Sequence, residues 1–425
     1  MKKILKKKKR ITDSNLSKFK NINREKYYRI KSYFLSINTY VINFFFVILF
    51  FPLSIIIFPL YLYLFKKNYK FIDNFMTGVG HLIPEFDSFK IENNFTNNIV
   101  LIDNGEEQFN FIKNNFQFKK IISNKYLFYF FKFFIYYYPK LKLNVSFTKH
   151  KNFVGLNIFS ESYKLKYYFK FYNEYLKIRK KNNSFFKSYI KNIKTPESLS
   201  DLIDQNKKIV CVHIKEIVIN AVGQQVDPSS YLETLNYLNQ NNFQIFFIGR
   251  EKFPKIFKEI NIFDYANSNF ASFENDLILI NKSFLNIICG SGISYIPDAL
   301  DKRYLYINSW HISRPGGIGN KSLILPSLVY NNFNNNYLSF KDQAILENSG
   351  NMFFPQFIDK RKFSVRNVSS AELLDSTVEI INDDFNNLDT RQLKFKDNIK
   401  NYGWIFNSNA NISKNFVKKY ESLLS

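Results

Sequence analysis

The 425-residue sequence is poor in cysteine, histidine, glycine and proline, and each scarcity excludes a class of protein. Two cysteines, Cys211 and Cys289, are too few for a disulfide scaffold and too far apart for a local CxxC zinc site. Thirteen glycines and eleven prolines exclude a collagen-like or low-complexity chain. No D-x-D pair or GxSxG elbow is present, and the four histidines are scattered. The sequence therefore predicts no metal, no cofactor and no acyl-enzyme nucleophile.

Basic and apolar residues are abundant, and both are unevenly distributed. The formal net charge is +25, and residues 1–31 hold 13 Lys or Arg against Asp13 and Glu25. No charged residue occurs from Ser32 to Phe65. About 20 apolar residues suffice to cross a bilayer, and a signal peptide would have a shorter apolar run nearer the N-terminus. We therefore expect a membrane anchor that follows a basic tail.

The form of this anchor is left open by its flanks and its prolines. Pro52 and Pro59 interrupt the apolar run, and basic residues stand on both sides of it. The positive-inside rule then favours an interfacial or re-entrant segment on the cytoplasmic face over a single span. A buried core helix is the alternative. Nucleic-acid binding by the tail is disfavoured because no stacking aromatics or nucleic-acid motif accompany it.

The rest of the chain is predicted to form two α/β halves. In the first half, Asn98–Asp103 and Lys119–Ser123 are expected strands, and the aromatic stretch Tyr126–Tyr138 is a core helix or a second membrane-contacting face. In the second half, strands and helices alternate, which predicts a parallel sheet covered on both faces. The expected strands are Lys208–Ile214, Phe243–Ile248, Phe284–Cys289 and Arg303–Ile307, and the expected helices begin at Asp227, Ser272 and near Pro297, with a further one at Ser370–Asn382.

Polar and small residues follow each expected strand of the second half. Ligands of such sheets bind beyond the carboxyl ends of the strands, so these residues are candidates for one shared site. A Gly-Ser-Gly turn lets backbone N–H groups approach a phosphate, and Lys or Arg can neutralise a diphosphate. The structural alternatives are that His213 is a strand histidine whose hydrogen bonds are made within the protein, and that the Gly-Ser-Gly sequence is an ordinary turn between a strand and a helix. The candidates are His213, Lys215, Glu216, Gly249, Arg250, Gly290, Ser291, Gly292 and Asn308.

The corresponding region of the first half is the segment Thr77–Asp87. Gly78 and Gly80 allow its loop a wide range of backbone conformations, and Pro84 suits the first turn of a helix. A histidine or carboxylate there can act as general base toward an acceptor hydroxyl, and a helix cap with structural acids is the alternative. The candidates for this base are His81, Glu85 and Asp87.

Several short motifs resemble a family of bacterial glycosyltransferases encoded in surface-polysaccharide gene clusters. Gly80–Asp87 is similar to the family's "GHL…E…D" opening, Val210–Glu216 to its "HvRE" strand, and Phe284–Gly292 to its "SG" step. Weaker similarities include Asp264, in a piece resembling "iDYa", and Asn308. The His-x-Arg strand also resembles the donor-binding motif of the fucosyltransferase superfamily. Lys215 replaces the arginine there, so the charge is kept and the bidentate fork is lost.

The resemblance implies a GT-B-like α/β fold in which two Rossmann-like domains face each other across a cleft. It implies a metal-independent transfer of sugar from a nucleotide-sugar donor to a glycan or lipid-linked acceptor. The expected domains are a basic cytoplasmic tail (1–31), a membrane anchor (32–69), an acceptor domain (70–190), a linker (191–207), a nucleotide-sugar domain (208–382), and a C-terminal tail or helix packing back on the acceptor domain (383–425).

Two other functions remain open from the sequence. A nucleotide-sugar epimerase has the same two-domain architecture, although the apolar segment argues against it because such an enzyme is expected to be soluble. A non-catalytic glycan-binding membrane protein is suggested by the lost arginine. We expect a protein at the cytoplasmic face of the inner or plasma membrane, in contact with it through residues 1–70, and no nucleic-acid partner.

Overall fold

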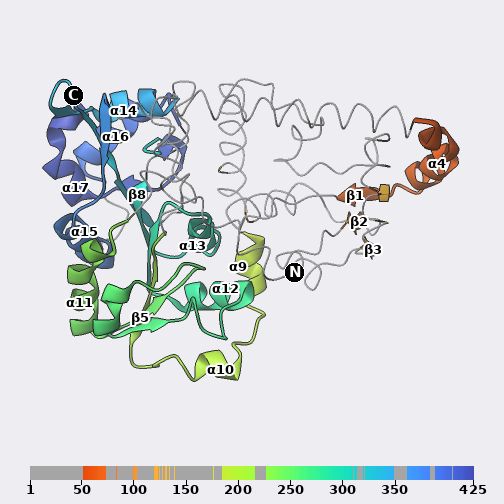
Figure 1. Cartoon of the computed structure of the whole chain (residues 1–425), viewed down its shortest axis with the longest axis horizontal. Coiled ribbons are helices and arrows are strands. Elements are labelled where there is room, and N and C mark those ends of the chain that lie inside the picture. Colours follow the sequence, from red (N-terminus) through yellow and green to blue (C-terminus); the bar gives the residue numbers. More distant parts are fainter. Residues whose placement is uncertain are drawn as a thin grey trace, which may run out of the picture. The chain divides into compact units, whose positions relative to one another are not determined.

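The computed structural model describes residues 51–72, 99–102, 119–122, 184–215, 226–309, 311–313, 321–348, 361–382, 388–403 and 405–425, together with single residues between these ranges. The fold is mixed α/β with parallel sheets (Figure 1). By chain contacts the protein divides into one unit of residues 1–58 and 150–159 and a second unit that holds the remainder.

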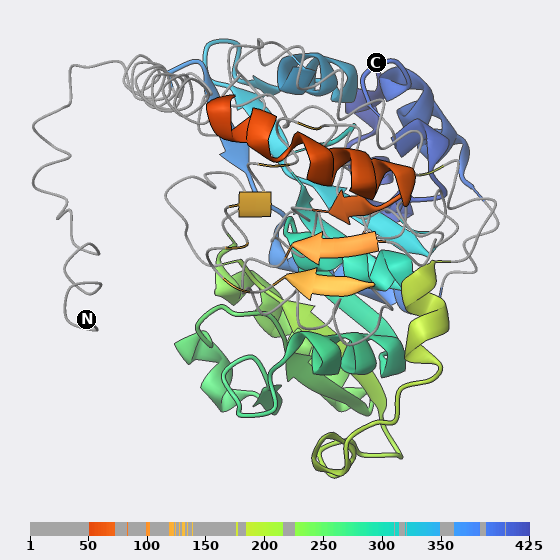
Figure 2. The ribbon, with the colours of Figure 1, turned by 90° about the vertical axis from the view of Figure 1, so that its right-hand side faces the viewer.

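The first half contains a small parallel sheet. Strands β1 (Lys70–Ile72), β2 (Ile99–Ile102) and β3 (Lys120–Ile122) pair in the order β1-β2-β3, and Figure 2 shows them pointing the same way. The two strands expected here are confirmed as β2 and β3, and β1 was not foreseen. Within the expected aromatic helix, the described residues from Leu127 to Phe134 are helical, and Phe134 is fully buried.

The second half is built on a seven-stranded sheet in which every pairing is parallel. Numbered along the chain, its strands stand in the order 3-2-1-4-5-6-7, and the first six follow the doubly wound dinucleotide-binding order. In that same order the strands are β6 (Ile262–Asp264), β5 (Phe243–Phe247), β4 (Lys208–His213), β7 (Leu285–Cys289), β8 (Tyr304–Ser309), β9 (Ser322–Pro326) and β13 (Asn411–Ile412).

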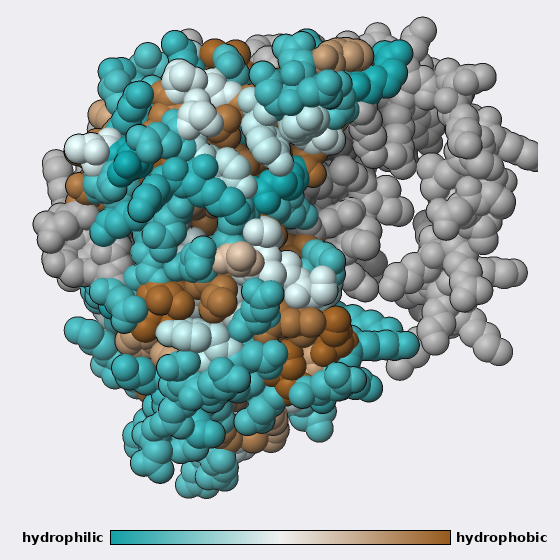
Figure 3. Space-filling view, turned by 90° about the vertical axis from the view of Figure 1, so that its left-hand side faces the viewer, coloured by the Kyte–Doolittle hydropathy of each residue, from teal (hydrophilic) through white to brown (hydrophobic). Residues whose placement is uncertain are grey.

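Helices cover both faces of this sheet, which explains why its central strands β7 and β8 are buried along their whole length and are mostly apolar (Figure 1). The helices α11 (Leu232–Gln240) and α15 (Ser370–Asn382) lie on one face, and α12 (Phe273–Lys282) and α13 (Tyr295–Ala299) lie on the other. Figure 3 views the outer side of the first layer, where hydrophilic side chains surround scattered hydrophobic ones. Further helices in the described part of the second half are α9 (Phe185–Ile190), α10 (Glu197–Ser200), α14 (Phe340–Asn348), α16 (Thr390–Ile399) and α17 (Lys414–Lys419).

Local sequence accounts for several of these helices. Ser272 caps α12 by accepting a hydrogen bond from Asn275 N, and Asp227 caps the 3-10 turn that leads into α11. Leu235 and Leu238 of α11 are fully buried, as their helical spacing predicts. The four expected strands of this half are thus confirmed, with ends shifted by one or two residues. Its expected helices are confirmed too, although the one expected from Asp227 opens with a 3-10 turn and α11 itself begins at Leu232.

The C-terminal segment differs from its expected role as a tail. Asn411–Ile412 forms β13 beside β9 and extends the second sheet, while α17 packs on α15. Residues 332–348, for which no element was expected, contain β11 (Asn336–Tyr337) and α14. A separate antiparallel sheet has the order β11-β10-β12, with β10 at Leu328–Asn331 and β12 at Phe363–Arg366. Short strands of this kind carry little periodic signal, because two to four residues are too few to show alternation.

The expected membrane anchor lies partly outside the described residues. Residues 51–56 are helical, and α4 (Phe58–Lys66) follows after a turn at Ile57. Within the part of the chain that the structure describes, no helix is both long enough and apolar enough to cross a membrane. Leu64 is buried, whereas Leu62 and Phe65 are half exposed.

Candidate functional site

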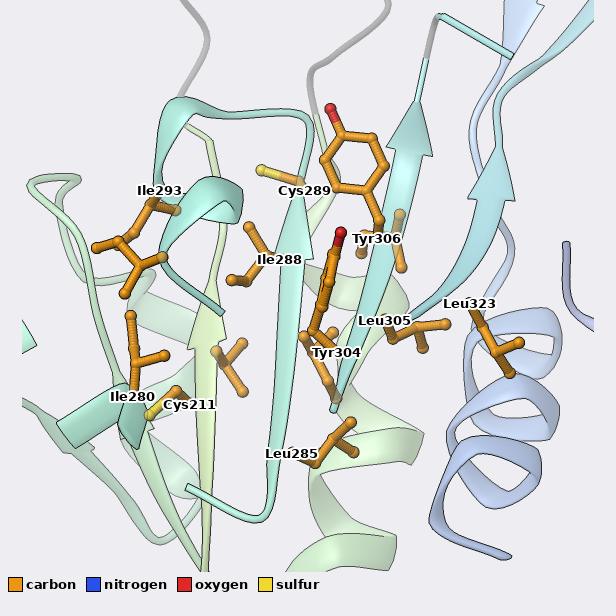
Figure 4. Close-up of a cluster of buried hydrophobic side chains, with 14 of the residues drawn as sticks. Cys211, Ile280, Leu285, Ile288, Cys289, Ile293, Tyr304, Leu305, Tyr306 and Leu323 are labelled. Carbon is orange, nitrogen blue, oxygen red and sulfur yellow. The ribbon is translucent and has the colours of Figure 1, made fainter. Parts of the chain in front are cut away.

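The candidate site lies where the strand order reverses, at the carboxyl ends of β4 and β7. These strands are neighbours in the sheet, but the chain leaves them toward opposite sides because β5 lies beyond β4 and β8 lies beyond β7. Loops that diverge in this way leave a crevice at the sheet edge, where ligands of doubly wound folds bind. Figure 4 shows Leu285 at the start of β7 and Cys289 at its carboxyl end.

Lys215 and Gly290 come together at this switch point. The backbone N–H of Lys215 donates to Cys289 Sγ at 2.9 Å, and Lys215 Nζ lies 3.5 Å from the carbonyl oxygen of Gly290. The lysine is partly exposed, and the residues that follow Gly290, Ser291 and Gly292, are partly exposed as well. A cation and a small-residue turn are thus adjacent at an edge open to solvent.

The turn after β7 is tighter than the sequence suggested. Gly292–Ser294 is a 3-10 turn, and the helix α13 that follows it has five residues. Both the N–H and the hydroxyl of Ser294 donate to the carbonyl oxygen of Ser291, at 3.2 and 2.7 Å. A helix this short adds little dipole, so any anion held here would depend chiefly on backbone N–H groups and on Lys215.

His213 is the buried centre of the site rather than an exposed group. Its side chain is 2% exposed, and both ring nitrogens have partners. Nε2 lies 3.1 Å from Glu251 Oε2, and Nδ1 lies 3.5 Å from Cys289 Sγ. The imidazole therefore links the carboxyl ends of β4, β5 and β7, and a contact with a ligand would require one of these interactions to break.

The electrostatics of this link favour a charged pair. Burial opposes protonation of His213, but Cys289 and Glu251 together raise its pKa from 6.5 to about 10. Burial likewise opposes ionisation of Glu251, yet its hydrogen bond and attraction to His213 hold the pKa of this carboxyl below its usual value. The pair is consequently an imidazolium and a carboxylate at neutral pH, with both donors of the ring engaged.

Gly249 permits the close approach of these groups. Its φ is +110°, a conformation that L side chains rarely adopt, and a Cβ at this position would lie 2.6 Å from both His213 Cδ2 and Glu251 Oε2. Arg250 follows with its side chain exposed, and its backbone N–H donates to Glu251 Oε2 at 2.9 Å. The turn after β5 is therefore fixed by a histidine on the neighbouring strand.

Two further candidates have structural partners. Asp264, at the end of β6, accepts hydrogen bonds from the backbone and side chain of Asn267. Asn308 is buried, adopts a positive φ of 51°, and its Oδ1 accepts from Val368 N at 2.7 Å. Asn308 thus joins β8 to the segment that leads into α15, and its binding role stays a prediction.

The remaining candidates lie outside the described residues. These are Gly78, Gly80, His81, Glu85, Asp87 and Glu216. Among the residues that are described, no group of three His, Cys, Asp or Glu side chains could hold a metal ion.

Sequence reasoning missed two carboxylates that shape the site. Glu251 stands directly after Arg250, and a carboxylate at a strand end next to a buried histidine was a signal that could have identified it. Glu347, on α14, is fully buried and accepts from the backbone N–H of Ile312 and from Ser313. It thereby holds the loop after β8, although it follows Ile312 by 35 residues in the sequence. No local sequence pattern indicates a contact between residues so far apart along the chain.

Comparisons with known proteins give a weak likeness to solved structures. No protein-family model matches the chain, and no curated protein matches it. ADP-heptose LPS heptosyltransferase II of E. coli aligns at 8% identity and a TM-score of 0.42, covering 73% of this chain and 98% of that one. A family 9 glycosyl transferase from Veillonella parvula aligns at 8% identity and 0.39, covering 61% and 86%. An E. coli heptosyltransferase solved with ADP aligns at 10% identity and 0.32, covering 61% and 92%.

Proposed function

We propose that this protein is a glycosyltransferase of GT-B-like architecture that transfers a sugar from a nucleotide-sugar donor to a glycan or lipid-linked acceptor during surface-polysaccharide synthesis. The observation that carries the proposal is the contact of Lys215 with Gly290 at the switch point of a sheet with the dinucleotide-binding strand order. This is the place where such a sheet holds a diphosphate.

The proposed chemistry is stabilisation of the departing nucleoside diphosphate. Negative charge develops on the β-phosphate as the bond to the sugar breaks, and fixed cations and N–H groups stabilise that charge most when they need no rearrangement. Lys215 and Arg250 supply the cations, and the Gly290–Gly292 turn supplies backbone N–H groups. This mechanism requires no metal ion, because the protein itself provides the positive charge.

His213 and Glu251 are positioning residues in this mechanism. Their interaction joins the turn of Gly249 and Arg250 to β4, and Cys289 joins His213 and the backbone of Lys215 to β7. Loss of this connection would let the two cations move independently. Among the expected bases, His81, Glu85 and Asp87 remain the proposed partners of the acceptor hydroxyl.

We further propose that the protein acts at the cytoplasmic face of the membrane. The uncharged run Ser32–Phe65 and its basic flanks support this, and so do the apolar side chains exposed on α4. Large apolar groups that face water favour insertion into the interface of a bilayer. This location would bring the enzyme to a lipid-linked acceptor.

A donor-binding experiment tests the function. The full-length protein is titrated with UDP-, GDP- and ADP-sugars, and the wild type is compared with Lys215→Ala, Arg250→Ala and the matched control Lys252→Ala, an exposed lysine in the same turn. We expect one donor to bind, with at least tenfold weaker binding in each of the first two variants. Absence of any donor binding, or equal binding in all four proteins, would refute the assignment.

Product analysis separates the remaining functions. Transfer only in the presence of a glycan or lipid-linked acceptor supports a glycosyltransferase. Conversion of the donor sugar without an acceptor would identify an epimerase, and glycan binding that is independent of any nucleotide would identify a non-catalytic binding protein.

A further inference from the structure

A second concave site lies at the amino ends of the strands of the seven-stranded sheet, opposite to the candidate site at their carboxyl ends. Its volume is about 680 Å³, and its lining includes the first residue of β4 and the residues that directly precede β7, β8 and β9. Because β4 has six residues, its two ends are about 17 Å apart. The groove is therefore separate from the candidate site at the carboxyl ends of the same strands.

Basic side chains dominate this groove. Six basic and two acidic residues line it: Lys207, Lys208, Lys282, Lys302, Arg303 and Lys321 against Asp204 and Asp301.

The two acidic residues of the groove already have cationic neighbours. Asp204 lies 3.9 Å from Lys207, and Asp301 lies 3.2 Å from Lys187 and 3.9 Å from Lys321. Within the described part of the chain, no carboxylate lies at ion-pair distance from the other three lysines of the groove, which are Lys208, Lys282 and Lys302.

The groove also holds part of its charge in a fixed arrangement. Lys208 Nζ and the Arg303 guanidinium lie 4.7 and 4.8 Å from the centre of the Phe284 ring. Arg303 is further held by a 2.8 Å hydrogen bond from Nη1 to the carbonyl oxygen of Ile381 in the last turn of α15. Cations placed in advance lose little conformational freedom when an anion binds.

Crowding of like charge is itself unfavourable here. Burial, and next the proximity of Lys321, lower the pKa of Lys302. An anion in the groove would relieve both the repulsion and the unpaired positive charge.

We propose that this groove binds a soluble ligand carrying two or three linked phosphate groups. The excess of four positive charges among the lining residues matches the charge of such a ligand. The volume of the groove falls within the range of small-molecule sites, about 300–1,000 Å³, whereas a bilayer surface is flat. The proposal is independent of the sugar-transfer function, because the two sites lie at opposite ends of the strands.

Neutralising the exposed lysines tests this site. Tripolyphosphate is titrated into the full-length protein and into the triple variant Lys208→Gln, Lys282→Gln, Lys321→Gln by calorimetry. The matched control carries the same change at three exposed lysines elsewhere, Lys341, Lys394 and Lys418. We expect about tenfold weaker binding in the groove variant and unchanged binding in the control, since each exposed cation contributes modestly.

The candidate diphosphate site and lipid headgroups are distinguished by two further arms. Arg250→Gln should leave tripolyphosphate binding in the groove intact, so a loss confined to Arg250→Gln would overturn the proposal. Vesicles containing phosphatidylserine should sediment equally with the wild type and the groove triple variant. If only vesicle binding, and not tripolyphosphate binding, depends on the groove lysines, the ligand is a lipid surface and the proposal is wrong.

Discussion

Replacing Glu251 by Gln removes the charge of the group that links His213 to the turn after β5 while it preserves shape. The two side chains are 3.1 Å apart and are 2% and 22% exposed for His213 and Glu251. Removing one partner of a buried charged pair leaves the other charge without compensation. We expect the Glu251→Gln variant to be less stable than the wild type at neutral pH.

The size of the effect follows from the pKa of His213. The rise from 6.5 to about 10 corresponds to about 5 kcal/mol in favour of the imidazolium, shared between Cys289 and Glu251. Breaking a buried ion pair by removing one partner costs about 3–5 kcal/mol, and Glu251 is 22% exposed, so we expect the variant to lose about 2–3 kcal/mol of unfolding free energy at pH 7.

The pH dependence gives this prediction its sign. A histidine whose pKa is raised on folding adds stability that is complete below pH 6.5 and is lost as the pH rises through about 10. The difference between wild type and Glu251→Gln should therefore be full near pH 6.5, almost unchanged at pH 7, and should shrink toward pH 10.

Urea unfolding followed by circular dichroism at pH 7, 8.5 and 10 measures this difference. The matched control is Glu259→Gln, which removes the same charge from an exposed glutamate on the segment that follows the same turn. A difference that stays constant with pH, or is equally large in the control, would show that Glu251 does not hold His213 in its charged form.

Three further predictions concern other parts of the structure. Glu372 is 2% exposed, and its pKa is lowered to about 2 because the hydrogen bonds from Arg366, Lys419 and other donors outweigh the effect of burial. The Glu372→Gln variant should lose at most about 3 kcal/mol of unfolding free energy. In urea unfolding, the advantage of the wild type should disappear as the pH falls from about 4.5 toward 2. Gly249→Ala forces a methyl group against His213 and should lower the unfolding free energy by about 1–3 kcal/mol, and an unchanged urea midpoint would refute the strain. Leu62→Ser with Phe65→Ser on α4 should reduce sedimentation with anionic vesicles, whereas Leu393→Ser, at an equally exposed leucine of α16, should not.

Much of the second half could be predicted because its signals are local. Ser272 caps the helix that it was expected to begin, and β7 is a buried, mostly apolar strand followed directly by glycine. The order of these elements along the chain also implied a parallel sheet. Such features depend on residues within one or two turns of each other, so the sequence alone contains them.

The sequence by itself placed Lys215, Arg250 and Gly290 after strands of a parallel sheet, because the carboxyl end of a strand is marked by where its apolar run stops. Only the tertiary structure showed which strands are neighbours and that Glu251 and Cys289 meet at His213. It also revealed the basic groove, whose lining lysines come from segments more than 100 residues apart. Such contacts depend on the strand order, and loops of similar composition are compatible with several orders. The physical reason is that burial and electrostatic interactions depend on which residues are close in space, whereas a sequence pattern contains information only about residues that are close along the chain.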